Sequence, residues 1–471
     1  MKFNVLILIL AVIFSGSGVA AQQRLELGKL RQKTIAEVHN DLHIGCEALD
    51  RGYADYDAYK GYLEPLGMRY IRLQAGWARI EQKKGSYNFK WLDRIIDDAV
   101  NRGLEPWLQT SYGNPIYKGG GTPFINGGWP TSDEAKAAWD RWVRALAERY
   151  KGKVHTWEIW NEPDELVDPY RGKVNGKHQY GPRVPGSFEG LVDLQIRTAE
   201  IIRSVDPDAV IAACGLARLN PAFVEELVVA FKAAGKDHLF DYITYHGYKY
   251  RPEDMYPIVA KMQAVLDRQK VKIALWQGES GAPSRANAGG ALRDYEWTEI
   301  SQAKWNLRRV LSDRARMIRS GIYTIVDQNY ARTRAAKGLL ETNSFHKVIG
   351  TKAAYHAMRN LVSVYDNLDR PLPGDCVRVE TAEQISKYLF EDDDTKLKSV
   401  VLWIDADRPN NSERTESVTV ALSGFNFVEP VCVDLRTGII CRLPVSDDGN
   451  LLHDVPLYDS PILITEASLV I

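Results

Sequence analysis

The sequence predicts an α/β protein: a (β/α)8 TIM barrel with an appended C-terminal β-sandwich domain. From about residue 40 onward, short runs of β-branched and aromatic residues alternate with amphipathic helical segments, and eight such units follow one another. After about residue 365 the segments become short and alternate in polarity, with Asp-, Asn- and Gly-rich turns between them. The first pattern is typical of a closed parallel barrel and the second of a sandwich.

Each element of the barrel has its own signal. The segment 89–102, for example, has apolar residues at helical spacing and is followed by Gly103, a helix stop signal. The expected strands are 43–49, 70–74, 104–110, 154–160, 209–214, 242–245, 273–276 and 323–326. The expected helices are 56–66, 89–102, 135–150, 188–204, 221–234, 253–268 and 298–320. We assign residues 40–365 to the barrel and 366–471 to the sandwich, with residues 22–39 as a candidate additional piece of the sandwich.

The first residues predict an export signal. Lys2 precedes an apolar run from Val5 to Phe14, and small residues follow up to Ala21. This order is typical of a secretory signal peptide at residues 1–21. No other stretch approaches the ~20 consecutive apolar residues of a membrane span. We therefore expect a secreted or periplasmic protein with no membrane span after signal removal.

Charge and motif content argue against several kinds of partner. The formal net charge of −1 gives no electrostatic reason to expect nucleic acid. The chain lacks the Cys-x-x-Cys, His-Glu-x-x-His and regular calcium-loop patterns, so we predict no cofactor and no metal. Cys432 and Cys441 flank an expected hairpin and should face each other across two strands, which leaves open whether they form a disulfide. No pattern indicates an oligomeric state.

The segment His155–Asp164 is the most informative part of the chain. A β-branched and aromatic run reads as a buried strand, and Asn161-Glu162-Pro163 ends it, because Pro163 offers no amide donor. Glu162 is therefore expected at a strand tip beside indole rings, where apolar surroundings raise a carboxyl pKa and favour proton donation. A structural alternative is that Asn161 caps a following helix with Glu162 in its first turn.

A second carboxylate ends a similar run. Trp276-Gln-Gly-Glu279 follows a short apolar stretch and precedes glycine and proline turn signals. In a closed parallel barrel the C-terminal ends of all strands open on one face, so Glu162 and Glu279 should meet there. A retaining glycosidase needs two carboxyl groups at roughly 5 to 5.5 Å, and we assign Glu279 as nucleophile and Glu162 as acid/base.

These motifs resemble the clan A glycoside hydrolases, and within that clan family 39-like β-glycosidases. The similarity extends over most of residues 40 to 365, mainly as an order of elements. Trp160-Asn-Glu-Pro163 matches the clan motif, whereas Trp276-Gln-Gly-Glu279 differs from the Thr-Glu or Ser-Glu pairing common in family 39. The resemblance implies a β-glycosidase that acts on plant- or microbe-derived oligo- or polysaccharides by double displacement.

Further residues could complete the site. Asn161 could fix a sugar hydroxyl, and Arg72 lies on the second expected strand, where it could pair with Glu158 or reach Glu279. The resemblance implies that Arg72 orients the nucleophile, and that His246 and Tyr248 belong to a His-x-Tyr element whose tyrosine hydrogen-bonds it. The alternative for Arg72 is an internal salt bridge, and for His246 a structural histidine.

Aromatic residues near the expected strand ends are candidates for binding sugar rings. Tyr112 and Trp129 follow the third strand and could bound the cleft, together with Tyr117. Trp276 could form the floor of the subsite for the cleaved sugar, whereas core packing is the commoner role of such side chains.

Two other functions would fit parts of this pattern. A non-catalytic carbohydrate-binding barrel would keep the aromatic residues without needing both acids, and a transglycosylase would use the same two carboxylates. Because both acids are present, the sequence favours an enzyme. It does not define the sugar, the linkage, or whether cleavage is internal or terminal.

Overall fold

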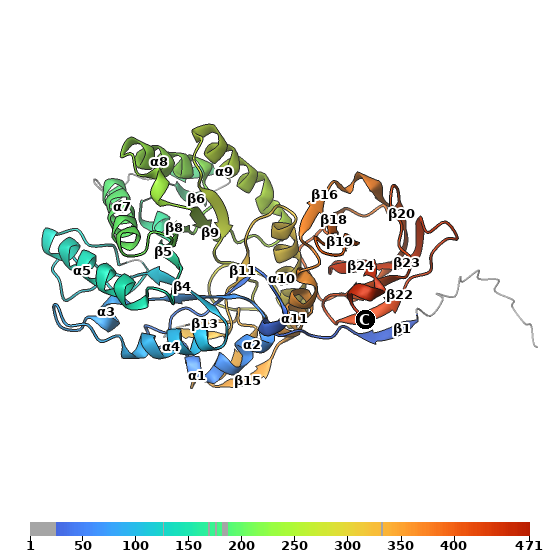
Figure 1. Cartoon of the computed structure of the whole chain (residues 1–471), viewed down its shortest axis with the longest axis horizontal. Helices are drawn as coiled ribbons and strands as arrows, with labels where there is room; N and C mark the ends of the chain where they lie inside the picture. Colours follow the sequence, from blue (N-terminus) through green and yellow to red (C-terminus); the bar gives the residue numbers. More distant parts are fainter. Residues whose placement is uncertain (1–24, 126, 168–169, 175–176, 181–186, 331–332) are drawn as a thin grey trace, which may run out of the picture.

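The computed structural model describes residues 25–125, 127–167, 170–174, 177–180, 187–330 and 333–471. The expected signal peptide lies outside these ranges. Figure 1 shows a barrel surrounded by helices and, beside it, a group of β-strands that contains the C-terminus. Among the described residues, no helix combines the length and the apolar character that crossing a bilayer requires.

Eight parallel strands form the barrel sheet, in the order β10-β9-β8-β5-β4-β3-β2-β11. Their bounds are β2 (His43–Gly45), β3 (Tyr70–Gln74), β4 (Glu105–Thr110), β5 (Thr156–Asn161), β8 (Val210–Leu216), β9 (Tyr242–Tyr245), β10 (Ala274–Gln277) and β11 (Gly321–Ile322). The two ends of the sheet meet where Trp276 forms a parallel bridge with Arg319, and Gln277 N donates to the Arg319 carbonyl at 3.0 Å. The prediction of a (β/α)8 barrel is confirmed.

The eighth strand was placed two residues too late by the sequence. It pairs with β2 at Gly321 and Ile322, whereas 323–326 was expected. A Cβ at Gly321 would lie 2.1 Å from the His43 carbonyl oxygen, so this close approach requires a glycine. The chain then bends toward the site, where Tyr323 N donates to the Ser280 carbonyl at 2.7 Å. The apolar run continues beyond Ile322 to Val326, and for this reason the sequence pattern placed the strand too late.

The helices lie outside the barrel sheet (Figure 1) and follow from amphipathic spacing and capping. In α4 the buried residues Leu92, Ile95, Ile96 and Ala99 form one face, and α5 begins where the Ser132 side chain accepts from Ala135 N. Their bounds are α1 (Tyr56–Tyr59), α2 (Leu63–Leu66), α3 (Trp77–Ile80), α4 (Lys90–Asn101), α5 (Asp133–Tyr150), α6 (Asp164–Val167), α7 (Ser187–Val205), α8 (Pro221–Ala233), α9 (Tyr256–Gln269), α10 (Glu299–Arg314) and α11 (Ala353–Tyr365).

The C-terminal strands form a seven-stranded and a three-stranded sheet. The larger runs β1-β22-β21-β24-β19-β18-β16 and the smaller β17-β20-β23. Residues of both sheets, such as Leu402 and Val420, share one hydrophobic cluster. The bounds are β1 (Glu26–Lys29), β16 (Arg370–Leu372), β17 (Val377–Val379), β18 (Ile385–Glu391), β19 (Lys398–Ile404), β20 (Glu416–Leu422), β21 (Pro430–Asp434), β22 (Ile439–Arg442), β23 (Leu451–Leu457) and β24 (Ile462–Glu466). Strand β1 pairs with β22, so the segment before the barrel contributes to the larger sheet.

Helix α10 joins the barrel to the C-terminal sheets and is buried along almost its whole length. Lys304 donates to Asp459 at 2.5 Å, and Arg308 donates to Glu253 at 2.7 Å and to the Asp407 carbonyl at 3.1 Å. Buried cations need such partners, so these bonds fix the C-terminal part against the barrel.

In the hairpin formed by β21 and β22, Cys432 lies directly opposite Cys441, as predicted.

Three hairpins were not predicted. They are formed by β6 (Tyr170–Val174) with β7 (Lys177–Tyr180), β12 (Gln328–Tyr330) with β13 (Thr333–Ala335), and β14 (Leu340–Thr342) with β15 (Val348–Thr351). The second of these hairpins follows β11 and brings Tyr330 to the open end of the barrel, where it lines the main cavity.

Candidate active site

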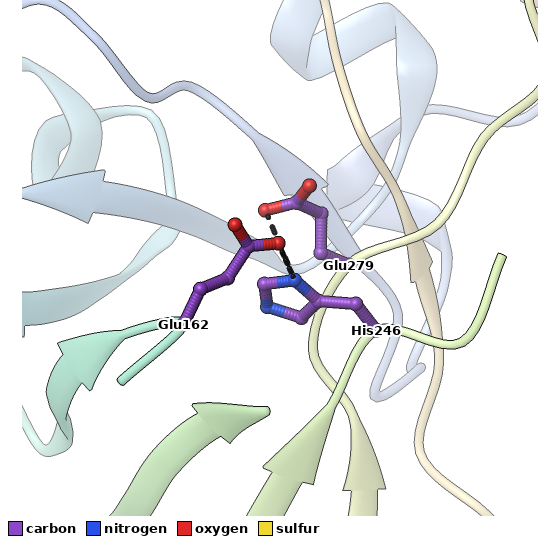
Figure 2. Close-up of side chains that lie close together, drawn as sticks. All are labelled: Glu162, His246 and Glu279. Carbon is purple, nitrogen blue, oxygen red and sulfur yellow. Dashed lines mark hydrogen bonds and ion pairs between the residues drawn. The ribbon is translucent and has the colours of Figure 1, made fainter. Parts of the chain in front are cut away.

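Three side chains from the ends of β5, β9 and β10 converge at one end of the barrel (Figure 2). Glu162 follows β5, His246 follows β9, and Glu279 lies two residues after β10. One oxygen of each carboxylate and a ring nitrogen of His246 all lie within 4.8 Å of one another. The two acids that the sequence singled out are therefore adjacent, as the parallel barrel required.

The backbone at Glu162 is held in an uncommon conformation. Trp160 and Glu162 have φ angles of 67° and 52°, in the left-handed region that residues other than glycine seldom adopt. Glu162 N donates to the Gly215 carbonyl of β8 at 2.7 Å. Such strain is tolerated where the surrounding structure fixes it, and it is concentrated at functional sites. Here it turns the Glu162 side chain, which is 21% exposed, toward His246.

Arg72 organises the interior below the two acids. Its guanidinium group is fully buried and donates to Glu158 at 2.7 Å, Glu47 at 2.7 Å, Asn161 Oδ1 at 2.8 Å and Glu279 at 3.3 Å. Both expected contacts of Arg72, the internal ion pair with Glu158 and the contact with Glu279, occur together. Asn161 is the last residue of β5 and α6 begins only at Asp164, so the alternative that Asn161 caps the following helix with Glu162 in its first turn is wrong.

Glu279 is surrounded by donors and positive charge. Tyr248 OH donates to Oε1 at 2.7 Å, and Arg72 and His246 Nδ1 lie 3.3 and 3.7 Å from Oε2. Burial raises the pKa of this carboxyl, but His246, Arg72, the Tyr248 hydrogen bond and Lys337 together lower the pKa below its ordinary value. These surroundings favour the ionised form of Glu279, which is the form that the nucleophile expected at this position requires.

His246 connects the two acids. Its Nδ1 lies 2.8 Å from Glu162 Oε1, the interaction drawn in Figure 2, and the ring is completely buried. Burial lowers the pKa of His246, but Glu279 and Glu162 outweigh that effect and the pKa is raised. The same three side chains could supply ligands to a metal ion. A cation would have to compete with the Arg72 and Tyr248 contacts of Glu279, so the arrangement favours two carboxyl groups held by protein donors.

A cavity of about 530 Å³ opens above these residues. It is lined by the predicted residues Glu162, Glu279, Asn161, Tyr248 and Tyr112, while Arg72 and His246 lie buried behind it. Its other walls are Glu47, Ala48, Arg51, Gln74, Ile125, Glu165, Ala217, Gly289, Gly290, Ala291, Tyr323, Tyr330, Thr333, Ala335 and Lys337. Such a mixture of carboxyl, amide, cationic and aromatic groups suits a ligand rich in hydroxyl groups.

Comparison with known proteins places this geometry in a family context. Residues 61–117 match the family model of glycoside hydrolase family 42, described as β-galactosidase. A β-xylosidase of Geobacillus stearothermophilus is 29% identical over 189 residues, which are 36% of this chain and 34% of that protein. The chain thus spans about a third of that relative.

Solved structures extend the similarity to almost the whole chain. A family 39 glycoside hydrolase from the gut symbiont Bacteroides cellulosilyticus WH2 has a TM-score of 0.66 at 17% identity, over 93% of this chain and 82% of that one. The chain resembles the clan A glycoside hydrolases. A monomeric β-xylosidase from Caulobacter crescentus CB15 has a TM-score of 0.60 at 15% identity, over 94% of this chain and 98% of that one. The predicted resemblance to clan A and its family 39-like members is confirmed.

Two tryptophan roles expected from the sequence do not hold. Trp276 is 0% exposed and stacks on Trp107 at 4.4 Å inside the barrel, so it does not line the cavity and cannot form its floor. It belongs to β10 itself and points into the barrel interior, below the turn that carries Glu279. Trp129 is also buried, against Trp160 at 6.1 Å. Tyr117 is buried as well and donates to Glu81 at 2.5 Å.

Glu47 and Lys337 are among the charged residues of the cavity that were not predicted. Glu47, just after β2, lines the cavity, and burial, opposed by Arg72 and reinforced by Glu279, raises its pKa to about 7. Lys337 lines the cavity from the segment after β13, donates to the Gly281 carbonyl at 2.8 Å and lies 4.0 Å from the centre of the Tyr248 ring. Burial lowers the pKa of Lys337 to about 7. Glu47 could have been suspected from its place at a strand end, whereas no local pattern marks Lys337.

The Tyr248 hydrogen bond leads to a prediction about pH. In Tyr248→Phe the pKa of Glu279 should rise, because one interaction that lowers it is lost. The carboxylate then becomes protonated at a higher pH as the pH falls, so the acid limb of the kcat/KM profile should shift to higher pH. We also expect kcat/KM near neutral pH to fall by about 10-fold, since a hydrogen bond to a charged group is lost.

The control for this prediction is Tyr355→Phe, which removes a 2.9 Å bond to the Tyr62 carbonyl away from the cavity. Its pH profile should match that of the unmodified protein. An acid limb that stays in place in Tyr248→Phe would show that this bond does not govern Glu279.

Proposed function

We propose that this protein is a retaining β-glycosidase that hydrolyses β-linked oligo- or polysaccharides by double displacement. The observation that carries the proposal is the pair Glu162 and Glu279, whose carboxylate oxygens lie within 4.8 Å of each other at the ends of β5 and β10. This spacing suits a retaining enzyme, whose carboxyl groups stand ~5 to 5.5 Å apart, and not an inverting one, which needs ~6.5 to 9.5 Å.

The surroundings of each acid support its role. In the first step, the ionised Glu279 attacks the anomeric carbon, and the bond to the leaving oxygen breaks as that oxygen takes a proton from Glu162. In the second step, Glu162 takes a proton from water, which attacks the same carbon and releases Glu279. The hydrogen bond between His246 Nδ1 and Glu162 Oε1 holds Glu162 beside Glu279 through both steps. With Oδ1 occupied by Arg72, the amide NH2 of Asn161 is the part that faces a sugar hydroxyl.

The proposal includes the organisation of the chain. Residues 40–365 form the catalytic barrel, and residues 366–471 form a β-sandwich to which residues 22–39 add β1. The shared hydrophobic cluster of the two C-terminal sheets supports the sandwich. We also propose that residues 1–21 direct the protein out of the cytoplasm, to the periplasm or the medium, which fits a polymeric or oligomeric substrate too large to enter the cell freely.

The first test is a panel of aryl β-xylosides, β-glucosides and β-galactosides, chosen because the relatives include β-xylosidases and a β-galactosidase. At least one should be hydrolysed. Products analysed with an added sugar acceptor separate a hydrolase from a transglycosylase. Binding of sugars without cleavage of any glycoside would favour the non-catalytic barrel.

The stereochemistry of the first product gives a sharper test. If Glu279 forms a covalent intermediate and water replaces it from the same face, the first sugar released must keep the β configuration. Proton NMR in the first minutes of the reaction, before mutarotation, should show the β anomer. An initial α anomer would mean that the two acids act across a wider gap with water between them.

A further inference from the structure

A second depression, of about 420 Å³, lies next to the catalytic cavity. It is formed by segments that follow β2, β3 and β4, and the side chains used below are Arg51, Tyr53, Arg79, Gln82, Pro123 and Phe124. None of these belongs to the catalytic machinery described above. Arg51 lines both the depression and the catalytic cavity, so the two spaces share a wall.

A second contact joins the two spaces. Tyr53 lines the depression and packs against Tyr330 of the catalytic cavity, with ring centroids 4.9 Å apart. Arg51 is fixed at this junction by Asp50 at 3.3 Å and by the Tyr112 ring, whose centre is 4.9 Å from the guanidinium carbon. A ligand that leaves the catalytic cavity past Arg51 therefore meets a preformed surface.

The chemistry of the depression fits a carbohydrate. Phe124 is 52% exposed, and Pro123 beside it adds a further apolar surface. Arg79 and Gln82 are exposed and offer hydrogen-bond donors on another wall. A pyranose ring has one apolar face and a rim of hydroxyl groups, so it can stack on an aromatic ring while its hydroxyls bond to polar side chains.

We infer that this depression is an additional sugar-binding subsite, and that the substrate is an extended β-linked oligosaccharide or polysaccharide which runs from the catalytic cavity past Arg51 onto Tyr53 and Phe124. The inference rests on the proposed glycosidase function. Binding energy from sugar units remote from the cleaved bond can be used in the transition state, so longer substrates are turned over more efficiently than short ones.

The experiment compares aryl glycosides with a chain-length series. The substrates are 4-nitrophenyl β-xyloside, β-glucoside and β-galactoside, and the matching β-1,4-linked oligosaccharides of two to five units. We expect kcat/KM for the sugar that is cleaved to rise by about 10-fold or more between the disaccharide and the tetrasaccharide. Phe124→Ala should remove most of this rise, lowering the ratio of tetrasaccharide to aryl glycoside activity. Phe124→Trp, which keeps an aromatic surface, should preserve the ratio.

Phe345→Ala is the matched control. Phe345 is 78% exposed between β14 and β15 and lines neither space. In Phe345→Ala the ratio of tetrasaccharide to aryl glycoside activity should therefore equal that of the unmodified protein. Equal kcat/KM values for the disaccharide and the tetrasaccharide, or a ratio in Phe124→Ala like that of Phe345→Ala, would overturn the subsite and leave the glycosidase proposal intact. Failure to cleave any aryl glycoside or oligosaccharide would overturn the glycosidase proposal itself, and the subsite with it.

Discussion

Replacing Glu279 by alanine is expected to abolish turnover of every substrate, with a loss on the order of 10⁴-fold or more in kcat/KM. Glu47, a further acid of the cavity, should not form the covalent intermediate in its place, because it is tied to Arg72 at 2.7 Å and has a pKa of about 7. The measurement is the steady-state rate on the best aryl glycoside, together with mass spectrometry for a glycosyl adduct, which should be absent.

Glu279→Gln controls for loss of shape, because an amide of the same size can still accept the Tyr248 hydrogen bond of 2.7 Å. It should be as inactive as the alanine variant while its thermal unfolding stays close to that of the unmodified protein. Substantial activity in either variant, or a covalent adduct on another residue, would show that the nucleophile lies elsewhere.

Glu162→Ala should behave differently according to the leaving group. On natural substrates, whose leaving alcohols need a proton, we expect a loss of about 10²- to 10⁴-fold. On an activated aryl glycoside the first step should survive and the glycosyl-enzyme should accumulate, since only the activation of water is lost. Added azide needs no general base, so it should restore turnover and give a β-glycosyl azide, identified by NMR.

The control for this variant is the same azide addition to the unmodified protein, which should change its rate little. An α-glycosyl azide from Glu162→Ala would assign the nucleophile to Glu162 instead. Near-normal activity of Glu162→Ala on unactivated substrates would remove Glu162 from the reaction.

The sequence predicted those parts of the site that depend on strand ends. Glu162 and Glu279 each end an apolar run at a turn, and a parallel barrel brings all such ends to one face, so their meeting followed from the fold. Arg72 could be found because a charged residue inside a strand of a barrel must have partners. Its four partners come from three different segments of the chain, and no single-sequence pattern could specify them together.

The residues that sequence reasoning misjudged or missed depend on direction and on irregular loops. Trp276 is close in sequence to Glu279, but its side chain fills the barrel interior. The alternation of side chains in a four-residue strand does not show whether a given residue points into the barrel interior or toward the cavity. Lys337 and Tyr330 reach the cavity from the hairpin region after β11, where turns replace regular spacing. Long connections after barrel strands carry functional residues, but they lack the hydrophobic periodicity from which strands and helices are predicted.

The pairing of β1 with β22 has a consequence for the order in which the protein can be completed. Gly28 lies opposite Ile440, so the first described strand of the chain finds its partner only after nearly all other residues have been synthesised (Figure 1). At ~5–20 residues per second, that delay is on the order of tens of seconds. All strands of the barrel sheet lie between His43 and Ile322, so the barrel can assemble before β22 has been synthesised. Closure of the larger C-terminal sheet by β1 is then a late event that ties the start of the chain to its end.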